Sequence, residues 1–294
     1  KPNYQNKIIA EDADTVTLYD GNGATLRRHK LHASTPEHIG YAIADKQDWL
    51  DKAKPYLTVS PERIKFAEYR DVRRRCLDRG RYFVWSGVNV FEAIHPICGH
   101  ENLLMGMALD PDWIRDMAET YAALMIGLWE ELFAAEGKPD ALWFYEDMGF
   151  KNRPFMSPEM YRELIMPSHQ KTIDYAHGIG CKVIMHSCGF VEPLLPSMIE
   201  AGIDCFQTIE VKAGMDLLRI YRNYGDKIAL MGGIDVRPLA ANDLPAMERE
   251  LRSKIPLVKG HNNFILHTDH SVPESTLLSS YQRFQELGLE LGKY

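Results

Sequence analysis

The sequence predicts an α/β protein built as a (β/α)8 TIM-type barrel, with an N-terminal β-hairpin and helical extension. From Tyr82 onward, short apolar runs alternate with longer amphipathic segments, which is the pattern of parallel βαβ units. Neither nucleotide fingerprint, GxGxxG or GxxxxGKS/T, follows any of these runs, so a Rossmann sheet is the less favoured alternative. Titratable residues gather where the predicted strands end, as they do at the carboxyl-terminal face of a barrel.

Residues 1–80 are predicted to form the N-terminal extension, and residues 81–294 the barrel. Two alternating runs at 15–20 and 24–29 flank Gly21, Asn22 and Gly23, which predicts a β-hairpin. The segments 45–54 and 61–80 are predicted as helices, and the second is rich in arginine.

Within the barrel, the strands are expected at 82–87, 141–145, 182–185, 204–211, 228–231 and 263–267. The clearest helix starts at Pro111, where Asp110 supplies a cap and proline suits the first turn. A second starts at Pro158, after Ser157. The full set of predicted helices is 111–137, 157–178, 191–201, 215–224, 242–259 and 273–288.

Charge and composition restrict the function. The net charge of −7 argues against nonspecific nucleic-acid binding, which needs a basic surface. No apolar run approaches the roughly 20 residues of a membrane span, and no signal peptide begins the chain. The five cysteines include no CxxC pair, which fits the reducing cytoplasm. The chain starts with Lys1 rather than Met, and we expect either a truncated N-terminus or a different N-terminal plan.

The most informative local feature is His186-Ser187-Cys188-Gly189, which follows the apolar run 183–185. Side chains alternate along a strand, so His186 and Cys188 should project from the same face. An imidazole and a thiolate that converge there form half of a zinc site. The alternative is that Cys188 is a small buried apolar residue and His186 a hydrogen-bonded core histidine.

The last predicted strand supplies candidates to complete such a site, because it ends in His267, Asp269 and His270. The choice among these three stays open, since strand alternation is lost where a strand ends. The other strand ends carry further candidate site residues, namely Trp85, Asn89, Glu146, Asp147, Gln207, Glu210 and Asp235.

Several of these acids also have structural interpretations. Glu146 and Asp147 could cap the turn that follows them, and Asp235 could cap the turn before Val236. Glu210 could pair with Lys212 or with Arg219 on the surface. His95 and His100 could be ordinary loop residues.

Taken together, four segments resemble the uroporphyrinogen decarboxylase superfamily, and more closely its corrinoid-dependent methyltransferase branch. The similarity covers roughly residues 81–294, and its motifs are residues 157–167, 186–189, 198–204 and 232–235. The family fold is a (β/α)8 barrel. The arginine-rich substrate motif of true uroporphyrinogen decarboxylases, of the type RQAGRY, has no match in this chain.

The resemblance implies a zinc site. Relatives in the methyltransferase branch use a His-x-Cys pair, which His186 and Cys188 match, and a later cysteine, to which His270 aligns. A histidine in that place makes the site less thiolate-rich and more electropositive, which favours O-demethylation over transfer to a thiol.

The implied activity is zinc-dependent methyl transfer between a small methylated substrate and a corrinoid (cobalamin) carried by a partner protein. Glu146 is then the candidate fourth ligand or acid–base partner, and Asp235 a second catalytic carboxylate. Trp85 and Tyr145 would form apolar walls, while Asp147, Gln207 and Glu210 would bind substrate. The methyl donor and acceptor stay open, as does the oligomeric state, a homodimer included.

Two other functions compete with methyl transfer. The first is metal-free decarboxylation of a porphyrinogen-like polycarboxylate, which needs basic residues in the pocket. The strand ends offer acids instead, with no arginine apart from Arg237. The second is a binding role without chemistry, which predicts a metal with no open coordination position.

Overall fold

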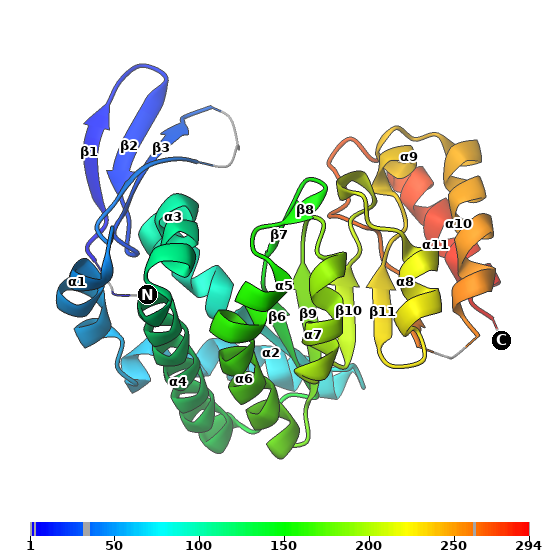
Figure 1. The fold of residues 1–294 in the computed structure, drawn as a ribbon. Coiled ribbons are helices and arrows are strands. Elements are labelled where there is room, and N and C mark those ends of the chain that lie inside the picture. The colour runs from blue at the N-terminus through cyan, green and yellow to red at the C-terminus, as the bar shows by residue number, and fades with distance from the viewer. Residues whose placement is uncertain (1, 3, 32–35, 261–262, 294) are drawn as a thin grey trace.

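A four-stranded antiparallel sheet forms the N-terminal part of the computed structural model, which describes residues 2, 4–31, 36–260 and 263–293. Its central strands form the predicted hairpin, and the Asp20 carboxylate stabilises the turn by accepting the N–H groups of Asn22 and Ala24. The sheet lies at the top of the molecule, against helix α3 (Val90–Leu109) (Figure 1). Its strands are β1 (Lys7–Glu11), β2 (Thr15–Tyr19), β3 (Ala24–His29) and β4 (Glu37–Tyr41).

A six-stranded parallel sheet forms the centre of the rest of the chain, in the order β12-β11-β10-β9-β6-β5. Neighbouring strands of this sheet follow one another in sequence, if the separate β7–β8 hairpin is left out. The strand order therefore never reverses as it would in a Rossmann sheet. These strands are β5 (Val84–Val88), β6 (Ala141–Tyr145), β9 (Lys182–Ser187), β10 (Cys205–Thr208), β11 (Ala229–Gly232) and β12 (Phe264–Ile265). A small hairpin of β7 (Gly149–Phe150) and β8 (Arg153–Pro154) follows β6.

The sheet is not a closed barrel in the described part of the chain, because β5 and β12 are edge strands without a second neighbour. The predicted α/β class, parallel pairing and sequential strand order are therefore found, whereas the predicted closure is not. Both edge strands carry exposed apolar side chains, such as Val88 and Ile265.

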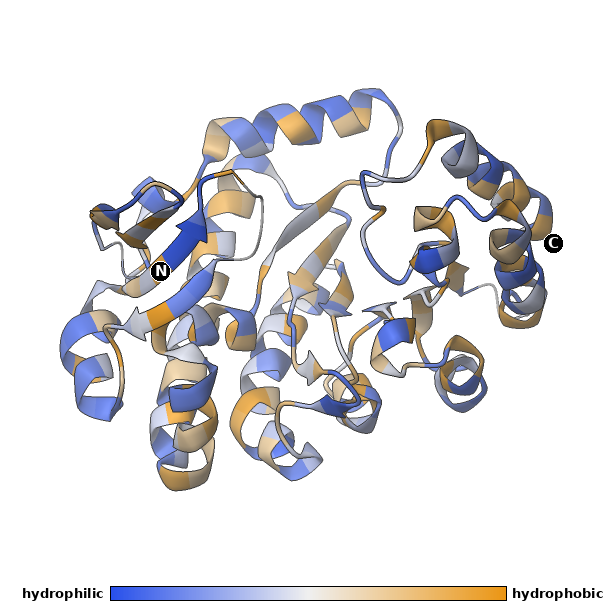
Figure 2. Cartoon of the chain, turned by 90° about the horizontal axis from the view of Figure 1, so that it is seen from above, coloured by the Kyte–Doolittle hydropathy of each residue, from blue (hydrophilic) through white to orange (hydrophobic). Residues whose placement is uncertain are grey.

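Helices cover one face of this sheet, and Figure 2 shows polar and apolar residues interleaved along them. The α4 helix begins as predicted, with Asp110 accepting the Trp113 N–H and Pro111 in the first turn. The helices are α1 (Lys46–Asp48), α2 (Phe66–Asp78), α4 (Pro111–Glu136), α5 (Pro158–Met160), α6 (Met166–Gly178), α7 (Leu195–Glu200), α8 (Leu217–Tyr224), α9 (Val236–Ala240), α10 (Leu244–Val258) and α11 (Leu278–Leu291). Short 3-10 and π segments extend several of them, namely η1 (Trp49–Ala53), η2 (Lys54–Tyr56), η3 (Pro61–Arg63), η4 (Tyr161–Ile165), η5 (Glu192–Leu194) and η6 (Val211–Ala213).

The α3 helix was not predicted, and it contains both His95 and His100, which were interpreted as loop residues. Pro96 and Gly99 interrupt the pattern that would indicate a helix, and Gly99 adopts a φ of 78° that kinks it. No helix among the described residues is both long enough and apolar enough to cross a membrane.

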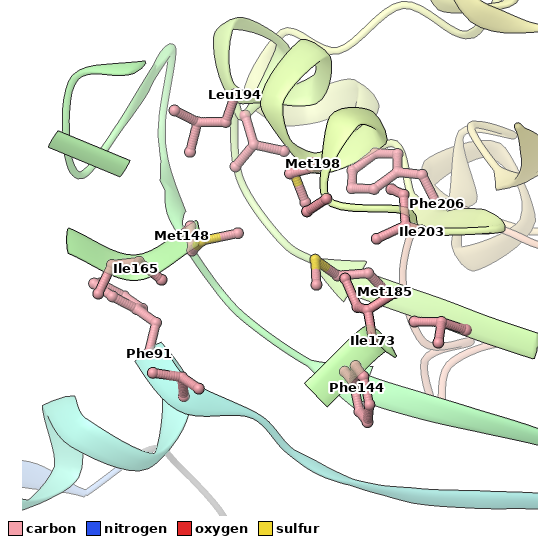
Figure 3. Close-up of a cluster of buried hydrophobic side chains, with 14 of the residues drawn as sticks. Phe91, Phe144, Met148, Ile165, Ile173, Met185, Leu194, Met198, Ile203 and Phe206 are labelled. Carbon is pink, nitrogen blue, oxygen red and sulfur yellow. The ribbon is translucent and has the colours of Figure 1, made fainter. Parts of the chain in front are cut away.

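Alternation along the strands separates the hydrophobic core from the candidate site. Phe144, Met185 and Phe206 point toward the helices and are fully buried, as the close-up of the core shows (Figure 3). Their strand neighbours Tyr145 and His186 point to the opposite, concave face, because successive side chains alternate. The core therefore fixes the concave face, on which the polar residues gather.

Candidate active site

Asp147, His186 and Cys188 bring one ligand atom each to a single point at the carboxyl end of the parallel sheet. These three atoms lie within 4.8 Å of one another. The His186 Nε2 is 3.2 Å from the Asp147 Oδ1 and 3.3 Å from the Cys188 Sγ. The prediction that His186 and Cys188 project together is confirmed, and the third member of the cluster is Asp147.

Strand pairing produces this arrangement. Tyr145 on β6 lies opposite His186 on β9, and His186 lies opposite Gln207 on β10. The chain past Tyr145 stays bound to β9, since the Glu146 N–H donates to the His186 carbonyl at 2.9 Å. Asp147 consequently follows where β6 ends, and its Oδ1 accepts the Cys188 N–H at 2.8 Å.

Gln207 orients the imidazole. Its Oε1 contacts the His186 Nδ1 and thereby leaves Nε2 facing Asp147 and Cys188. Metal-binding histidines are commonly fixed in this way by a hydrogen bond to the second ring nitrogen. Gln207, predicted to bind substrate, lies beneath the cluster with 4% of its surface exposed and also lines the adjoining cavity.

Electrostatics inside the cluster favour an imidazolium–carboxylate pair. Burial lowers the pKa of His186, but hydrogen bonds to Asp147 and Cys188 outweigh it and raise the pKa to about 10. Burial raises the pKa of Asp147, yet hydrogen bonds from His186 and the Cys188 N–H bring that pKa below its usual value. The pKa of Cys188 is raised, chiefly by burial. A metal ion would displace protons from both the imidazole and the thiol.

The donor set fits zinc. Nitrogen, sulfur and carboxylate oxygen are the atoms that zinc selects, at bond lengths of about 2.0–2.3 Å. Tetrahedral geometry then separates neighbouring ligand atoms by roughly 3.3–3.7 Å. The separations of 3.2 and 3.3 Å from the His186 Nε2 are close to that range. Three protein ligands would leave a fourth position open, as in catalytic zinc sites.

The cluster opens into a cavity of about 320 Å³ on the concave face of the sheet. Tyr145, predicted as an apolar wall, lines it and makes an edge-on ring contact with His186, with centroids 5.3 Å apart. Trp143 lines it too and was missed, although its position two residues before Tyr145 places it on the same face. The other lining residues are Cys188, Gln207, Thr208, His267, His270 and Ser271.

The candidates from the last strand are divided by the structure. His267 and His270 both line this cavity, but neither belongs to the cluster of ligand atoms. Asp269 is buried, and its carboxylate accepts the N–H groups of Val236 and Val211 at 2.8 and 2.9 Å. The cluster therefore contains Asp147 beside His186 and Cys188, while the predicted ligand His270 lies on the cavity wall.

Glu146 does not face the cluster. It is completely buried, and its two carboxylate oxygens accept the N–H groups of Phe91 and Glu92 at 2.8 and 2.7 Å, at the start of α3. The His169 Nε2 also contacts the carboxylate, and the Tyr161 hydroxyl is 2.9 Å from the His169 Nδ1. Glu146 therefore caps the start of α3 rather than the turn that follows it, and its bound oxygens do not face the cluster as an acid–base role would need.

Asp235 and Glu210 also make local contacts. Asp235 caps α9 by accepting the Arg237 N–H and forms an ion pair with that side chain at 2.6 Å. Glu210 accepts the Gly189 N–H at 2.7 Å and pairs with Lys212 at 3.3 Å. Of these contacts, the cap by Asp235 and the ion pair between Glu210 and Lys212 were the predicted structural alternatives.

Trp85 lies on the other face of the sheet from the cavity. Its partner in β6 is Leu142, a core residue, and its ring packs edge-on against Trp129 of α4 with centroids 5.3 Å apart. The register of β5 against β6 pairs Trp85 with Leu142 and Ser86 with Trp143, so alternation assigns Trp85 to the helix layer. The proposed substrate wall at this position is therefore corrected to Trp143.

Gly189 allows the chain to turn tightly beneath the β7–β8 hairpin. Its φ is 79°, and a Cβ there would lie 2.3 Å from the carbonyl carbon of Gly149. Only glycine fits here, because other residues are strained at this φ and their Cβ would clash with the Gly149 backbone, which has little freedom to move. The Phe190 N–H then donates to the Phe150 carbonyl at 2.9 Å and fixes the hairpin beside Cys188.

Comparisons with known proteins bear on the family and the fold. The model of the uroporphyrinogen decarboxylase (URO-D) family matches residues 93–288. A methylated-thiol–coenzyme M methyltransferase of Methanosarcina mazei is 28% identical over 264 residues, which cover 83% of this chain and 67% of that protein. A solved methyltransferase from Methanosarcina mazei has a TM-score of 0.63 at 14% identity, covering 88% of this chain and 73% of its own, and it supports the fold alone.

Proposed function

The chain belongs to the uroporphyrinogen decarboxylase family, and from that premise we propose that it is a methyltransferase acting on a small methylated substrate. The observation that carries the proposal is the convergence of Asp147, His186 and Cys188 at the mouth of an aromatic cavity. The similar protein of Methanosarcina mazei is a methyltransferase by name, which supports the reaction class.

Asp147, His186 and Cys188 would hold the zinc ion, and the ion would supply a Lewis acid for the heteroatom that carries or receives the methyl group. Gln207 keeps the His186 Nε2 directed at this position. The rings of Trp143 and Tyr145 provide an apolar wall for a methyl group, and His267 and His270 provide polar contacts opposite.

We propose a corrinoid protein as the partner that gives or takes the methyl group. O-demethylation and transfer involving a methylated thiol both suit a site with one thiolate ligand. The name of the similar methyltransferase points to thiol chemistry, whereas the histidine at position 270 was the argument for oxygen. An assay with methoxy and methylthio donors separates the two.

The decarboxylase alternative receives less support. None of the described residues that line the cavity with the cluster is Lys or Arg, so a polycarboxylate would find no cation there. The donor set of the cluster is instead suited to a metal.

Three broader expectations are retained as part of the proposal. The six parallel strands in sequential order support a (β/α)8 barrel. The antiparallel sheet ends at Tyr41 and the parallel sheet starts at Val84, which supports a division near residue 80. Five unpaired cysteines support a cytoplasmic location.

Elemental analysis of protein purified without chelator or metal-affinity tag tests the metal. We expect one zinc per chain, and His186→Ala, Cys188→Ala and Asp147→Asn should each lower both zinc content and methyl transfer to cob(I)alamin. Cys76→Ala removes a partly buried thiol on α2 and serves as the matched control. Full zinc content and full methyl transfer in His186→Ala would refute the proposal.

A further inference from the structure

Two cavities of different character meet at Cys188. The aromatic cavity of about 320 Å³ carries the cluster, and a second cavity of about 580 Å³ lies on the other side of Cys188, under the β7–β8 hairpin. The second cavity falls in the size range of small-molecule sites. It is lined by Gly149, Phe150, Lys151, Cys188, Gly189, Glu210, Lys212, Ala213 and Arg237.

The second cavity is cationic, although the chain as a whole has a net charge of −7. Its wall contains three cations, Lys151, Lys212 and Arg237, and one carboxylate, that of Glu210. The described wall of the aromatic cavity contains neither Lys nor Arg. Charge therefore distinguishes the two sides of Cys188.

The three cations differ in what already binds them. Lys212 pairs with Glu210 at 3.3 Å, and Arg237 pairs with Asp235 at 2.6 Å, so both are oriented by neighbouring acids. Lys151 forms no ion pair with any carboxylate of the described residues. Its ammonium group is thus the one on this wall that is open to an incoming anion.

The backbone holds these cations together. The Asn152 N–H donates to the Ala213 carbonyl at 3.1 Å, which ties the segment of Lys151 to that of Lys212. The Phe150–Phe190 bridge ties the same hairpin to the turn after Cys188. Lys151 is therefore placed by hydrogen bonds on both sides rather than by a free loop.

We propose that the second cavity binds the anionic end, a carboxylate or sulfonate, of the small molecule whose sulfur or oxygen reacts at the cluster. This inference rests on the proposed function for the identity of the reacting end. The anion contacts Lys151 and the outer faces of Lys212 and Arg237, while the heteroatom reaches Cys188 and the methyl group faces Trp143 and Tyr145. Charge-assisted hydrogen bonds of this kind give both affinity and orientation.

Calorimetric titration of zinc-loaded protein with matched thiols tests the subsite. Mercaptopropionate and mercaptopropanesulfonate carry an anion of either type, and mercaptopropanol is the neutral control of similar length. We expect both anions to bind at least about fivefold more tightly than the alcohol, and Lys151→Gln to weaken only the anions, by roughly three- to fivefold. Lys227→Gln removes an exposed lysine just before β11, at the amino end of the strands and away from the cluster at their carboxyl end, and should leave every affinity unchanged.

Propionate against propanol, titrated into metal-free protein, separates this inference from the proposed function. A preference for propionate that Lys151→Gln abolishes supports the subsite even if methyl transfer proves absent. Equal affinity for charged and neutral probes, no measurable binding of any anion, or equal losses in Lys151→Gln and Lys227→Gln would overturn it. Methyl transfer that persists in those cases leaves the proposed function standing.

Discussion

Removal of the Glu146 carboxylate should destabilise the protein far more than removal of a surface acid. The carboxylate accepts two backbone N–H groups at the start of α3, at 2.8 and 2.7 Å, and contacts the buried His169. Glu146→Ala leaves all three groups buried without a partner. Each such group costs about 1–3 kcal/mol, so we expect a loss of about 4 kcal/mol in the free energy of unfolding.

Glu146→Gln separates hydrogen bonding from charge. The glutamine amide keeps one oxygen that can accept a backbone N–H, but its NH2 group faces the second N–H and His169, which need an acceptor. The loss in the free energy of unfolding should therefore be about 2 kcal/mol. Against a typical stability of about 5–15 kcal/mol, both losses are measurable and neither need unfold the chain.

Urea denaturation followed by far-UV circular dichroism measures these losses, with Glu200→Gln as an exposed surface control on α7. Zinc affinity provides a second readout, because the Glu146 backbone precedes Asp147, the proposed ligand, and a misplaced segment should weaken binding. A loss below about 1 kcal/mol in Glu146→Ala would refute the claim that this carboxylate organises the start of α3.

Two further predictions concern the histidines and the tryptophans. Burial and the neighbouring His95 lower the pKa of His100 to about 4 from 6.5, so the unfolded chain binds a proton that the folded chain does not bind until about pH 4. The free energy of unfolding should therefore fall as pH decreases from about 7 toward about 4. His100→Phe should reduce that fall between about pH 7 and about pH 5 by roughly 1 kcal/mol, measured by urea titrations at each pH. The same pH dependence in the variant and the original protein would contradict this prediction. Trp143→Ala should raise the KM for the methyl donor several-fold, since this ring lines the cavity. Trp85→Ala should instead lower stability by about 2 kcal/mol with KM unchanged, and the opposite pattern would show that the two faces of β5 and β6 are wrongly assigned.

Local signals were sufficient for most of the fold. The hairpin at residues 15–29 follows from alternation and turn residues, and α4 follows from Asp110 and Pro111. The α3 helix escaped prediction because its kink at Gly99 and the proline at 96 conceal the helical period. Closure of the sheet into a barrel could not be predicted from the sequence pattern alone, because alternating strands and helices do not show which strands are neighbours.

The sequence predicted only those site contacts that arise within a single strand. Alternation along β9 was enough to bring His186 and Cys188 together. The third member of the cluster, Asp147, depends on which residue of β6 lies opposite His186, and a sequence contains no direct signal of that register. Trp85 was misplaced for a related reason, because its face depends on the register that pairs it with Leu142 of β6.

The acids at the strand ends differ in how many backbone N–H groups their carboxylates already accept. Glu146 and Asp269 each accept two backbone N–H groups and are buried, so their oxygens are already bound by the fold. Asp147 accepts one backbone N–H, and 44% of its side chain is exposed beside His186. A carboxylate that satisfies two buried amides would leave both unpaired if it turned to a metal, at a cost of about 1–3 kcal/mol each. Asp147 would lose at most one backbone hydrogen bond on binding a metal, so its free-energy cost is smaller. Among these three acids, Asp147 is therefore the one available for metal binding.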